Sequence, residues 1–287
     1  MKENLQNKVC LITGATNGIG EEAAKQIALM GAEIVFIARN QTKANQLNET
    51  IKSLTGREST PIIADLSSQL EVKKAAEEFL SLNKPLHILL NNAGIMNTSR
   101  RETVDGLEEV FSVNHLAYYT LTLLLMDKLI ACGPGRIVNV ASGAHMFIKE
   151  INFEDLQSEK EYKTMYVYGQ SKLANILFTR ELSDKVQGKG ITVNCLHPGF
   201  VNTGIGSNNS PTLGRILMAL ARPFSRKTDK GAETSIFLCT SPEVEGLSGE
   251  YYVDCEVSKI SGPAKSKDNA EKLWNISSKL TGINLHN

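Results

Sequence analysis

The sequence lacks a long apolar run, an excess of either charge and a signal-like N-terminus. A membrane-spanning helix needs about 18 or more consecutive apolar residues, and no stretch of the 287 residues approaches that length. The 31 basic and 31 acidic residues balance to a formal net charge of zero, which argues against a nucleic-acid-binding surface. The first eight residues, M-K-E-N-L-Q-N-K, have no apolar signal region. We therefore expect a cytoplasmic protein without a transmembrane segment.

Paired cysteines and metal-ligand clusters are also missing. The five cysteines are an odd number, none belongs to a C-x-x-C pair, and most lie in apolar runs such as V-C-L-I. This usage indicates buried thiols in a reducing compartment rather than a disulfide framework. No cluster of histidine, cysteine and aspartate has the spacing of metal ligands, so we expect no metal site.

What the sequence does contain is a regular alternation of short apolar runs with helical patterns. Nearly continuous Val/Ile/Leu runs are typical of strands buried on both faces, and helical crossovers between them demand a parallel sheet. Strands are expected at 9–13, 34–38, 61–64, 87–90, 136–140, 192–196 and 251–253, and helices at 19–30, 42–54, 67–82, 103–130 and 164–187. The whole chain, 1–287, is predicted to be one α/β domain of the Rossmann type. Its doubly wound sheet has seven parallel strands in the order 3-2-1-4-5-6-7 with helices on both faces, and a substrate loop or lid at about 202–228.

A glycine-rich turn, T-G-A-T-N-G-I-G, occupies residues 13–20 between the first strand and the first helix. Gly14, Gly18 and Gly20 allow a tight turn and a close approach to a pyrophosphate, which the free N–H groups of a helix start attract. An ordinary strand–helix turn is the alternative, and the spacing is G-x-x-x-G-x-G instead of G-x-G-x-x-G. The strand–turn–helix context favours a dinucleotide site.

The second strand ends in A-R-N, which bears on the kind of dinucleotide. An acidic residue here binds a ribose 2′-hydroxyl, whereas an arginine accommodates a 2′-phosphate. Arg39 therefore favours NADP(H) over NAD(H), because a guanidinium pairs well with phosphate. Lys43, one helical turn later, adds positive charge. The alternative is that Arg39 is an ordinary solvated surface residue.

Tyr168 and Lys172 lie four residues apart in Y-G-Q-S-K, in an expected helix. At ~100° per residue these two side chains share a face, whereas Tyr166 points elsewhere. A free tyrosine has a pKa of about 10 and is a poor base. We expect the Lys172 ammonium to lower that pKa and make Tyr168 a general acid/base. Ser142, at the end of an apolar strand, is expected to hold the reacting oxygen.

Together these motifs resemble the short-chain dehydrogenase/reductase family over essentially the whole chain. Further motifs match in order: D-L at 65–66 as an adenine contact, N-N-A-G at 91–94 beside the adenine ribose, F-S-V-N-H at 111–115, and P-G-F-V-N-T at 198–203 over the nicotinamide. The resemblance implies that Asn114 holds a water in a proton relay through Lys172. The implied catalytic residues are Asn114, Ser142, Tyr168 and Lys172. The implied cofactor-binding residues are Gly14, Thr16, Asn17, Gly18, Ile19, Gly20, Arg39, Asp65, Leu66, Asn92, Ala93, Gly94, Tyr168, Lys172, Pro198, Gly199, Val201 and Thr203.

Three C-terminal segments are similar to the retinol dehydrogenase-like branch, which includes the WW-domain-containing oxidoreductases. They are K-T-D-K-G-A-E-T at 227–234, S-G-E-Y-Y-V-D-C at 248–255 and L-W-N-I-S at 273–277. The resemblance implies an NADP(H)-dependent oxidoreductase that interconverts a hydrophobic aldehyde or ketone and its alcohol, as a homodimer or homotetramer. The alternative is a catalytically silent NADP(H)-binding sensor. Such a sensor would be expected to lack the serine, tyrosine or lysine, and none is missing.

Three features leave alternatives open. His145, three residues after Ser142, either lines the substrate cleft or is an ordinary loop histidine. The expected substrate contacts are Ser142, His145 and Tyr168. The apolar stretch 213–224 is a lid, a membrane contact or core, and the polar insertion at 148–163 has no role that the sequence reveals.

Overall fold

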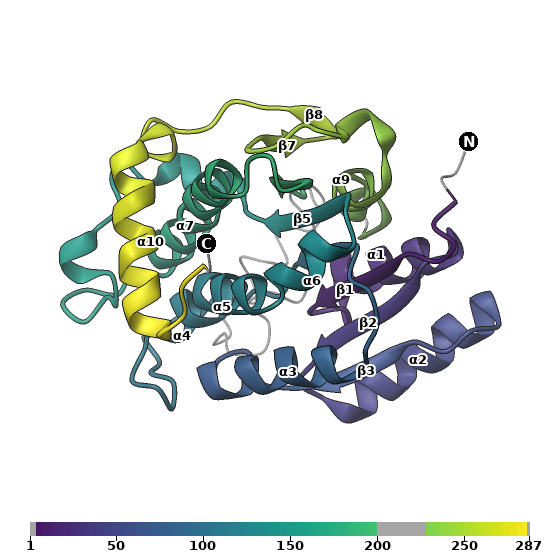
Figure 1. Cartoon of the computed structure of the whole chain (residues 1–287). Coiled ribbons are helices and arrows are strands. Elements are labelled where there is room, and N and C mark those ends of the chain that lie inside the picture. The colour runs from purple at the N-terminus through teal and green to yellow at the C-terminus, as the bar shows by residue number, and fades with distance from the viewer. Residues whose placement is uncertain (1–3, 200–227, 286–287) are drawn as a thin grey trace.

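One sheet of eight strands organises the computed structural model, which describes residues 4–199 and 228–285. The strands are β1 (Val9–Thr13), β2 (Glu33–Ala38), β3 (Thr60–Ile63), β4 (Ile88–Asn91), β5 (Gly135–Val140), β6 (Ile191–His197), β7 (Tyr251–Val253) and β8 (Glu256–Val257). Their order is β3-β2-β1-β4-β5-β6-β7-β8, and the first seven strands pair in parallel. The predicted fold class and the predicted order of these seven strands are confirmed (Figure 1).

The predicted number of strands is wrong by one, because β8 adds an antiparallel edge to β7. Asp254 and Cys255 join the two strands with φ angles of 53° and 66°. Two successive positive φ angles are typical of the tight two-residue hairpin turn whose twist suits antiparallel strands. A strand of two residues has no alternation to detect, and neither turn residue is glycine. The sequence therefore gave no signal for this hairpin.

Nine α-helices pack around the sheet in the described part of the chain. They are α1 (Gly18–Leu29), α2 (Gln41–Thr55), α3 (Gln69–Ser81), α4 (Glu109–Phe111), α5 (Ala117–Leu124), α6 (Met126–Ala131), α7 (Thr164–Lys185), α9 (Thr228–Thr240) and α10 (Lys267–Thr281). A single π-helical turn, Ser112–Leu116, joins α4 to α5. Local chemistry sets several ends. Asn40 and Ser68 accept hydrogen bonds from the first turns of α2 and α3, and Gly56 ends α2 at a φ of 72°.

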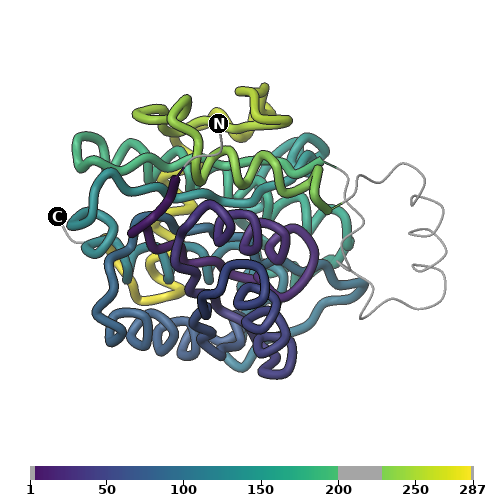
Figure 2. Tube along the Cα trace, turned by 90° about the vertical axis from the view of Figure 1, so that its right-hand side faces the viewer, coloured from purple at the N-terminus to yellow at the C-terminus, as the bar shows by residue number. Residues whose placement is uncertain are grey.

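Alternate residues of each strand face two separate cores. Cys10 and Ile12 of β1 pack with α1, α2 and α9, while Leu11 packs with α3, α5, α6 and α7. Figure 2 shows α1 in front of the sheet, with α9 above it and α2 below. Each fully buried aliphatic or phenyl side chain contributes about 1.5–3 kcal/mol, so burial on both faces accounts for the continuous apolar runs that identified the strands.

A third apolar cluster lies beyond the sheet, between α7, α10 and the insertion at 148–163. Ile148 and Ile151 of the insertion pack with Leu173 of α7 and Leu273 of α10, and Figure 1 shows α10 beside α7. This cluster fixes the outer side of the helix that carries Tyr168.

Some predictions fall outside what the structure tests. Residues 202–227 of the predicted loop, including the stretch 213–224, lie outside the described residues. Within residues 4–199 and 228–285, no helix combines the length and apolarity needed to cross a bilayer. The cytoplasmic location, the division into domains and the oligomeric state stay predictions.

Candidate active site

A cavity of about 400 Å³ runs along the carboxyl ends of the central strands. It begins at the turn after β1, passes the ends of β2 and β3, and reaches the end of β5 and the first turns of α7. In a parallel sheet this edge is where ligands bind. The predicted residues that line the cavity are Gly14, Thr16, Asn17, Ile19, Gly20, Arg39, Asp65, Leu66, Asn92, Ala93, Gly94, Tyr168, Lys172 and Pro198.

The glycine turn has no room for side chains at two of its positions. Gly14 has a φ of +67°, and a Cβ atom there would lie 2.8 Å from the Cα of Ala93. A Cβ on Gly20 would lie 2.4 Å from both the Nδ2 atom of Asn92 and the carbonyl oxygen of Gly14. Gly18 also has a positive φ, 59°, and begins α1. These glycines are needed because the turn and the segment after β4 are in close contact.

Hydrogen bonds join the glycine turn to the segment after β4. The Thr13 hydroxyl accepts from the backbone N–H groups of Asn92 (2.9 Å) and Ala93 (3.0 Å). In return, Asn92 Nδ2 donates to the carbonyl oxygens of Thr13 (3.0 Å) and Gly14 (3.2 Å). The Tyr118 hydroxyl donates to the carbonyl of Ala93 at 2.6 Å. The floor of the cavity is therefore rigid.

The start of α1 opens onto this cavity without a side-chain cap. Asn17 occupies the N-cap position in an extended conformation (φ −161°, ψ 150°), and its side chain makes no capping hydrogen bond. The first N–H groups of a helix that lack a side-chain partner, together with the helix dipole, attract an anionic group. This end of the cavity therefore suits an anionic group.

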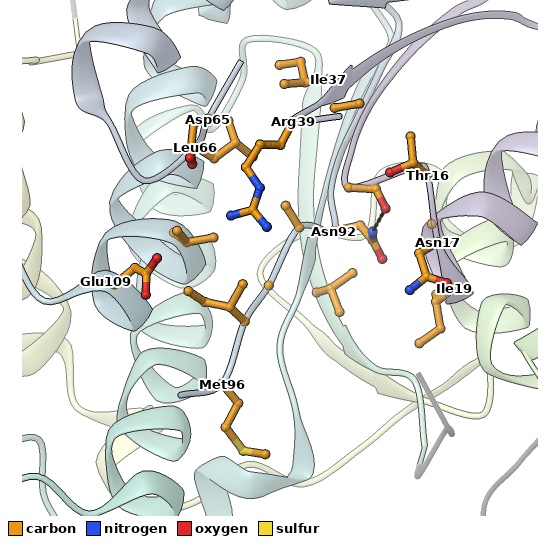
Figure 3. Close-up of a pocket in the computed structure, with 18 of the residues that line it drawn as sticks. Thr16, Asn17, Ile19, Ile37, Arg39, Asp65, Leu66, Asn92, Met96 and Glu109 are labelled. Carbon is orange, nitrogen blue, oxygen red and sulfur yellow. Dashed lines mark hydrogen bonds between the residues drawn. The ribbon is translucent and has the colours of Figure 1, made fainter. Parts of the chain in front are cut away.

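Arg39 projects its guanidinium into the cavity (Figure 3). No carboxylate of a described residue forms an ion pair with it. Lys43 lines the same part of the cavity. Asp65, opposite, accepts a hydrogen bond from Ser67 N–H at 2.9 Å, which fixes its carboxylate at the cavity wall. This end is positively charged overall and suits an additional phosphate.

The predicted catalytic group gathers at the other end of the cavity. Lys172 is 2% exposed, its Nζ donates to the carbonyl oxygen of Val140 at 3.0 Å, and it lies 5.7 Å from the centre of the Tyr168 ring. Ser142 caps the short 3₁₀ helix Gly143–Phe147 by accepting from Ala144 N–H at 3.2 Å. It also hydrogen-bonds Tyr168. The structure therefore brings Ser142, Tyr168 and Lys172 together, as the sequence predicts.

The expected effect of Lys172 on Tyr168 is not what the structure shows. Burial raises the pKa of Tyr168 above its ordinary value, and the hydrogen bond with Ser142 only partly opposes this. Burial also lowers the pKa of Lys172 to about 7, which reduces its positive charge at neutral pH. The physical reason is that desolvation disfavours the charged form of both groups. The prediction that Lys172 lowers the tyrosine pKa is wrong for the protein without a ligand.

Asn114 lies in the π-helical turn before α5 and fastens the backbone of Ile95. Its Oδ1 accepts from Ile95 N–H at 2.8 Å, and its Nδ2 donates to the Ile95 carbonyl at 3.0 Å and to Ser171 Oγ at 2.9 Å. A Cβ on Gly94 would lie 3.3 Å from the Lys172 Nζ atom and 3.5 Å from Asn114 Oδ1. The side chain thus positions the wall of the cavity beside Lys172.

His145 does not line the cleft. It is fully buried, its Nδ1 lies 2.7 Å from the carbonyl oxygen of Ser142, and its Nε2 accepts from Ser261 N–H at 3.3 Å. Burial lowers the pKa of His145, so the ring is neutral and Nδ1 carries the donated hydrogen. The prediction of a substrate contact fails because the ring is buried and both nitrogens are already used, Nδ1 by the Ser142 carbonyl and Nε2 by the Ser261 N–H.

The insertion at 148–163, whose role the sequence does not reveal, braces the opposite wall of the cavity. Gln157 Oε1 accepts from the backbone N–H of Glu108 at 2.7 Å. The Tyr162 hydroxyl donates to the carbonyl of Asn97 at 3.1 Å. Since Asn97 lines the cavity, the insertion fixes the position of this wall.

Several residues of the site were missed by the sequence reasoning. The lining residues without a predicted role are Ile37, Ala38, Ala64, Ile95, Met96, Asn97, Arg101, Glu109, Val113, Val140 and Ala141. Most are apolar or lie on loops, and only their position after a predicted strand could have indicated them. Gly199 lies just after Pro198 with a φ of 79°. Val201 and Thr203 lie outside the described residues. Among the described residues no group of three or more His, Cys, Asp or Glu could hold a metal ion.

Comparisons with known proteins show the family of this chain. A model of the family described as short chain dehydrogenase matches residues 8–214. Retinol dehydrogenase 12 of Mus musculus is 41% identical over 280 residues, which cover 97% of this chain and 88% of that protein. The WW domain-containing oxidoreductase of Gallus gallus is 38% identical over 286 residues, which cover 96% of this chain and 69% of that protein.

Two solved structures are similar over nearly the whole chain. An uncharacterized protein from Mycobacterium paratuberculosis has a TM-score of 0.81 at 26% identity, covering 99% of this chain and 97% of that chain. A short chain dehydrogenase from Burkholderia cenocepacia, solved in complex with NADP, has a TM-score of 0.68 at 26% identity. The match covers 92% of this chain and 100% of the Burkholderia chain.

Proposed function

This chain belongs to the short-chain dehydrogenase family and is an oxidoreductase of its retinol dehydrogenase-like branch, and from that premise we propose an NADP(H)-dependent enzyme that interconverts a hydrophobic aldehyde or ketone and its alcohol. One observation carries the proposal. A single cavity has an uncapped helix start and Arg39 at one end and Tyr168 and Lys172 at the other, and Ser142 interacts with Tyr168 there.

The residues of the cavity fit NADP(H). Gly14 and Gly20 let the turn pack tightly against the segment after β4, and a glycine turn of this kind lets its backbone approach a pyrophosphate. Arg39 offers a guanidinium that has no ion pair with a described residue, as a 2′-phosphate would require. The similar chain from Burkholderia cenocepacia was solved with NADP, which supports the preference over NAD(H).

Tyr168 and Ser142 then have different roles in carbonyl reduction. When bound, NADPH supplies a hydride to the carbonyl carbon. Tyr168 donates its phenolic proton to the carbonyl oxygen, and the Ser142 hydroxyl holds that oxygen by a hydrogen bond. Because burial raises the pKa of Tyr168, the phenol keeps its proton at neutral pH and is ready to donate it. In the oxidation direction the reverse transfer requires the Tyr168 phenolate, which takes the proton from the alcohol.

The surroundings of the catalytic end support an apolar substrate. Met146, Phe147 and Met165 are large apolar residues that stay exposed. They belong to the 3₁₀ helix that begins at Ser142 and to the first turn of α7, two elements that pack together. Exposed apolar side chains gathered beside a polar site favour a substrate with an apolar body.

The test is to follow the loss of reduced-nicotinamide absorbance with NADPH and with NADH. The panel contains aliphatic, aromatic, steroidal and retinoid carbonyls, and Tyr168→Phe is the matched variant. Turnover with NADPH that is lost in Tyr168→Phe would support the proposal. NADPH binding without turnover of any carbonyl would favour the alternative of a silent NADP(H) sensor.

A further inference from the structure

Gly169 and Gln170, which follow Tyr168 on α7, lie against the elements that come after β5. Both residues are buried. Gln170 Oε1 accepts a hydrogen bond from the backbone N–H of Asn152 at 2.8 Å, which fastens the insertion at 148–163 to the helix. The proposed reaction assigns a role to neither residue.

Gly169 has no room for a side chain. A Cβ atom there would lie 2.9 Å from the carbonyl oxygen of Ala144 and 2.9 Å from the Cδ1 atom of Ile148. Glycine weakens the interior of a helix relative to alanine, so packing and not helix formation explains its place in α7. Ile148 has little freedom to withdraw, because it is 2% exposed and belongs to the same apolar cluster as Leu173. The missing side chain therefore lets the backbone of α7 lie directly against the 3₁₀ helix Gly143–Phe147.

Ala144 connects this contact to Ser142. Its carbonyl oxygen is one of the two atoms nearest to the position of a Gly169 Cβ, and its backbone N–H donates to Ser142 Oγ at 3.2 Å. Tyr168 immediately precedes Gly169 in α7. A displacement of α7 away from Ala144 would thus move Tyr168 away from Ser142. A displacement of Ala144 would move the N–H group that orients the serine hydroxyl.

We propose that Gly169 is a positioning residue that sets the separation between Tyr168 and Ser142. It does so by leaving the space in which the Ala144 carbonyl and Ile148 pack against α7. The consequence for catalysis rests on the function proposed above, whereas the effect on the separation does not. The insertion at 148–163 thereby gains a role at its first residue, since Ile148 fills this space.

Gly169→Ala tests the positioning role by kinetics. The added methyl group must displace α7 or Ala144, and a small displacement of a reacting group is costly. With any carbonyl that the wild type reduces, kcat should fall about 10- to 100-fold. The Kd of NADPH should change by less than about threefold, because the glycine turn and Arg39 lie at the other end of the cavity.

Gly262→Ala is the control for the loss of a glycine. A Cβ at Gly262 meets no atom within 4 Å, so kcat should equal that of the wild type.

Ile148→Val is the compensating change, because it removes the Cδ1 atom. Gly169→Ala/Ile148→Val exchanges one methyl group for another, and such volume-conserving exchanges are tolerated best. Its kcat should be about threefold or more above that of Gly169→Ala, since the two positions are in contact and their effects do not add. Should Gly169→Ala fail to fold, the double variant replaces it. Its kcat should then be lower than that of Ile148→Val, because the overlap with the Ala144 carbonyl remains.

Crystal structures of the wild type and Gly169→Ala measure the separation directly and need no turnover. The distance between Ser142 Oγ and the Tyr168 hydroxyl should increase by about 0.5 Å or more, which exceeds the tolerance of a catalytic geometry, and should stay unchanged in Gly262→Ala. A wild type without turnover would defeat the proposed function and leave this distance to decide the role of Gly169. An unchanged distance in Gly169→Ala, or no gain in kcat on adding Ile148→Val, would overturn the positioning role.

Discussion

Gly20 and Asn92 meet so closely that a single Cβ atom cannot be placed between them. The atom would lie 2.4 Å from Asn92 Nδ2 and equally close to the carbonyl of Gly14. The same Nδ2 donates to the carbonyls of Thr13 and Gly14. The glycine turn and the end of β4 are therefore one unit, and the absence of a side chain at Gly20 lets them pack together.

Gly20→Ala should weaken NADPH binding and lower stability. The methyl group must displace Asn92 or the turn, and overpacking of this kind costs about 1–3 kcal/mol. We expect a roughly tenfold or larger rise in the Kd of NADPH, measured by the fluorescence of the bound nucleotide. The control is Gly262→Ala, since a Cβ at Gly262 meets no atom within 4 Å and its φ is −52°. Equal losses in both variants would contradict the argument.

Arg39→Asp should reverse or abolish the preference for NADPH. The guanidinium lies in the cavity, and a hydrogen bond to a charged group contributes about 1.5–3 kcal/mol. The kcat/KM for NADPH should fall about 10- to 100-fold, while that for NADH stays equal or rises. Arg101→Gln is the control, because it removes another positive charge from the cavity wall. Arg101 does not belong to the segment after β2 that is expected to read the 2′-phosphate. A ratio of NADPH to NADH activity that changes equally in both variants would show a nonspecific charge effect.

Tyr168→Phe should remove the proton donor and spare cofactor binding. General acid catalysis contributes about 10²- to 10⁴-fold, so kcat should fall by that amount while the Kd of NADPH changes little. Tyr166→Phe is the matched control on the same helix, since the Tyr166 hydroxyl donates to the carbonyl of Glu150 at 3.3 Å. Substantial reductase activity in Tyr168→Phe would remove this residue from the mechanism.

The sequence predicted the parallel strands and the glycine turn because both depend on local patterns. Val9–Thr13 and the neighbouring strands are mostly apolar because both faces of the sheet are buried, and Gly14 and Gly20 are required by one short turn. Ser142 and Tyr168 were found because motif order and helix spacing place them. Roles that depend on contacts distant in the sequence were not accessible. The hydrogen bond of His145 to Ser261, for example, joins residues 116 positions apart.

The direction of the Tyr168 pKa shift also could not be predicted, because it depends on contacts between residues distant in the sequence. The spacing of Tyr168 and Lys172 indicated a charged neighbour and thus a lower tyrosine pKa. How deeply both groups are buried depends on the assembled walls of the cavity, and burial has the larger effect on each. A four-residue spacing contains no information on that burial.

His145→Leu should reduce kcat because it allows Ser142 to move from its position. The neutral ring donates from Nδ1 to the Ser142 carbonyl at 2.7 Å and accepts at Nε2 from Ser261, so its loss frees the backbone that aims the serine hydroxyl. A displacement of this size costs roughly 10- to 100-fold in kcat, with NADPH affinity close to the wild type. His145→Gln should recover part of the loss, since its amide can donate to the same carbonyl. Wild-type kcat in His145→Leu would show that Ser142 is held by other contacts.

Lys172→Met should change how stability depends on pH. Burial lowers the pKa of Lys172 from 10.5 to about 7 in the folded protein. Between these values the unfolded chain binds a proton that the folded chain does not, so this group makes stability rise with pH across that window. The slope approaches about 1.4 kcal/mol per pH unit. Methionine has no such proton, and the free energy of unfolding of Lys172→Met should therefore rise less steeply from pH 7 upward.

Urea unfolding of both proteins at a series of pH values from about 6 to 9.5 measures this difference directly, since ΔG is obtained from each transition. The ionisation of Tyr168 changes stability with pH in the opposite direction, so it cannot account for a rise in stability between about pH 7 and 10. Its pKa is raised by burial, so above about pH 10 the folded protein retains a proton that the unfolded chain loses, and stability falls with pH there. Parallel pH profiles for wild type and Lys172→Met would mean that the lysine is charged at neutral pH in the folded protein. Lys172 would then favour ionisation of Tyr168, as its spacing on the helix first indicated.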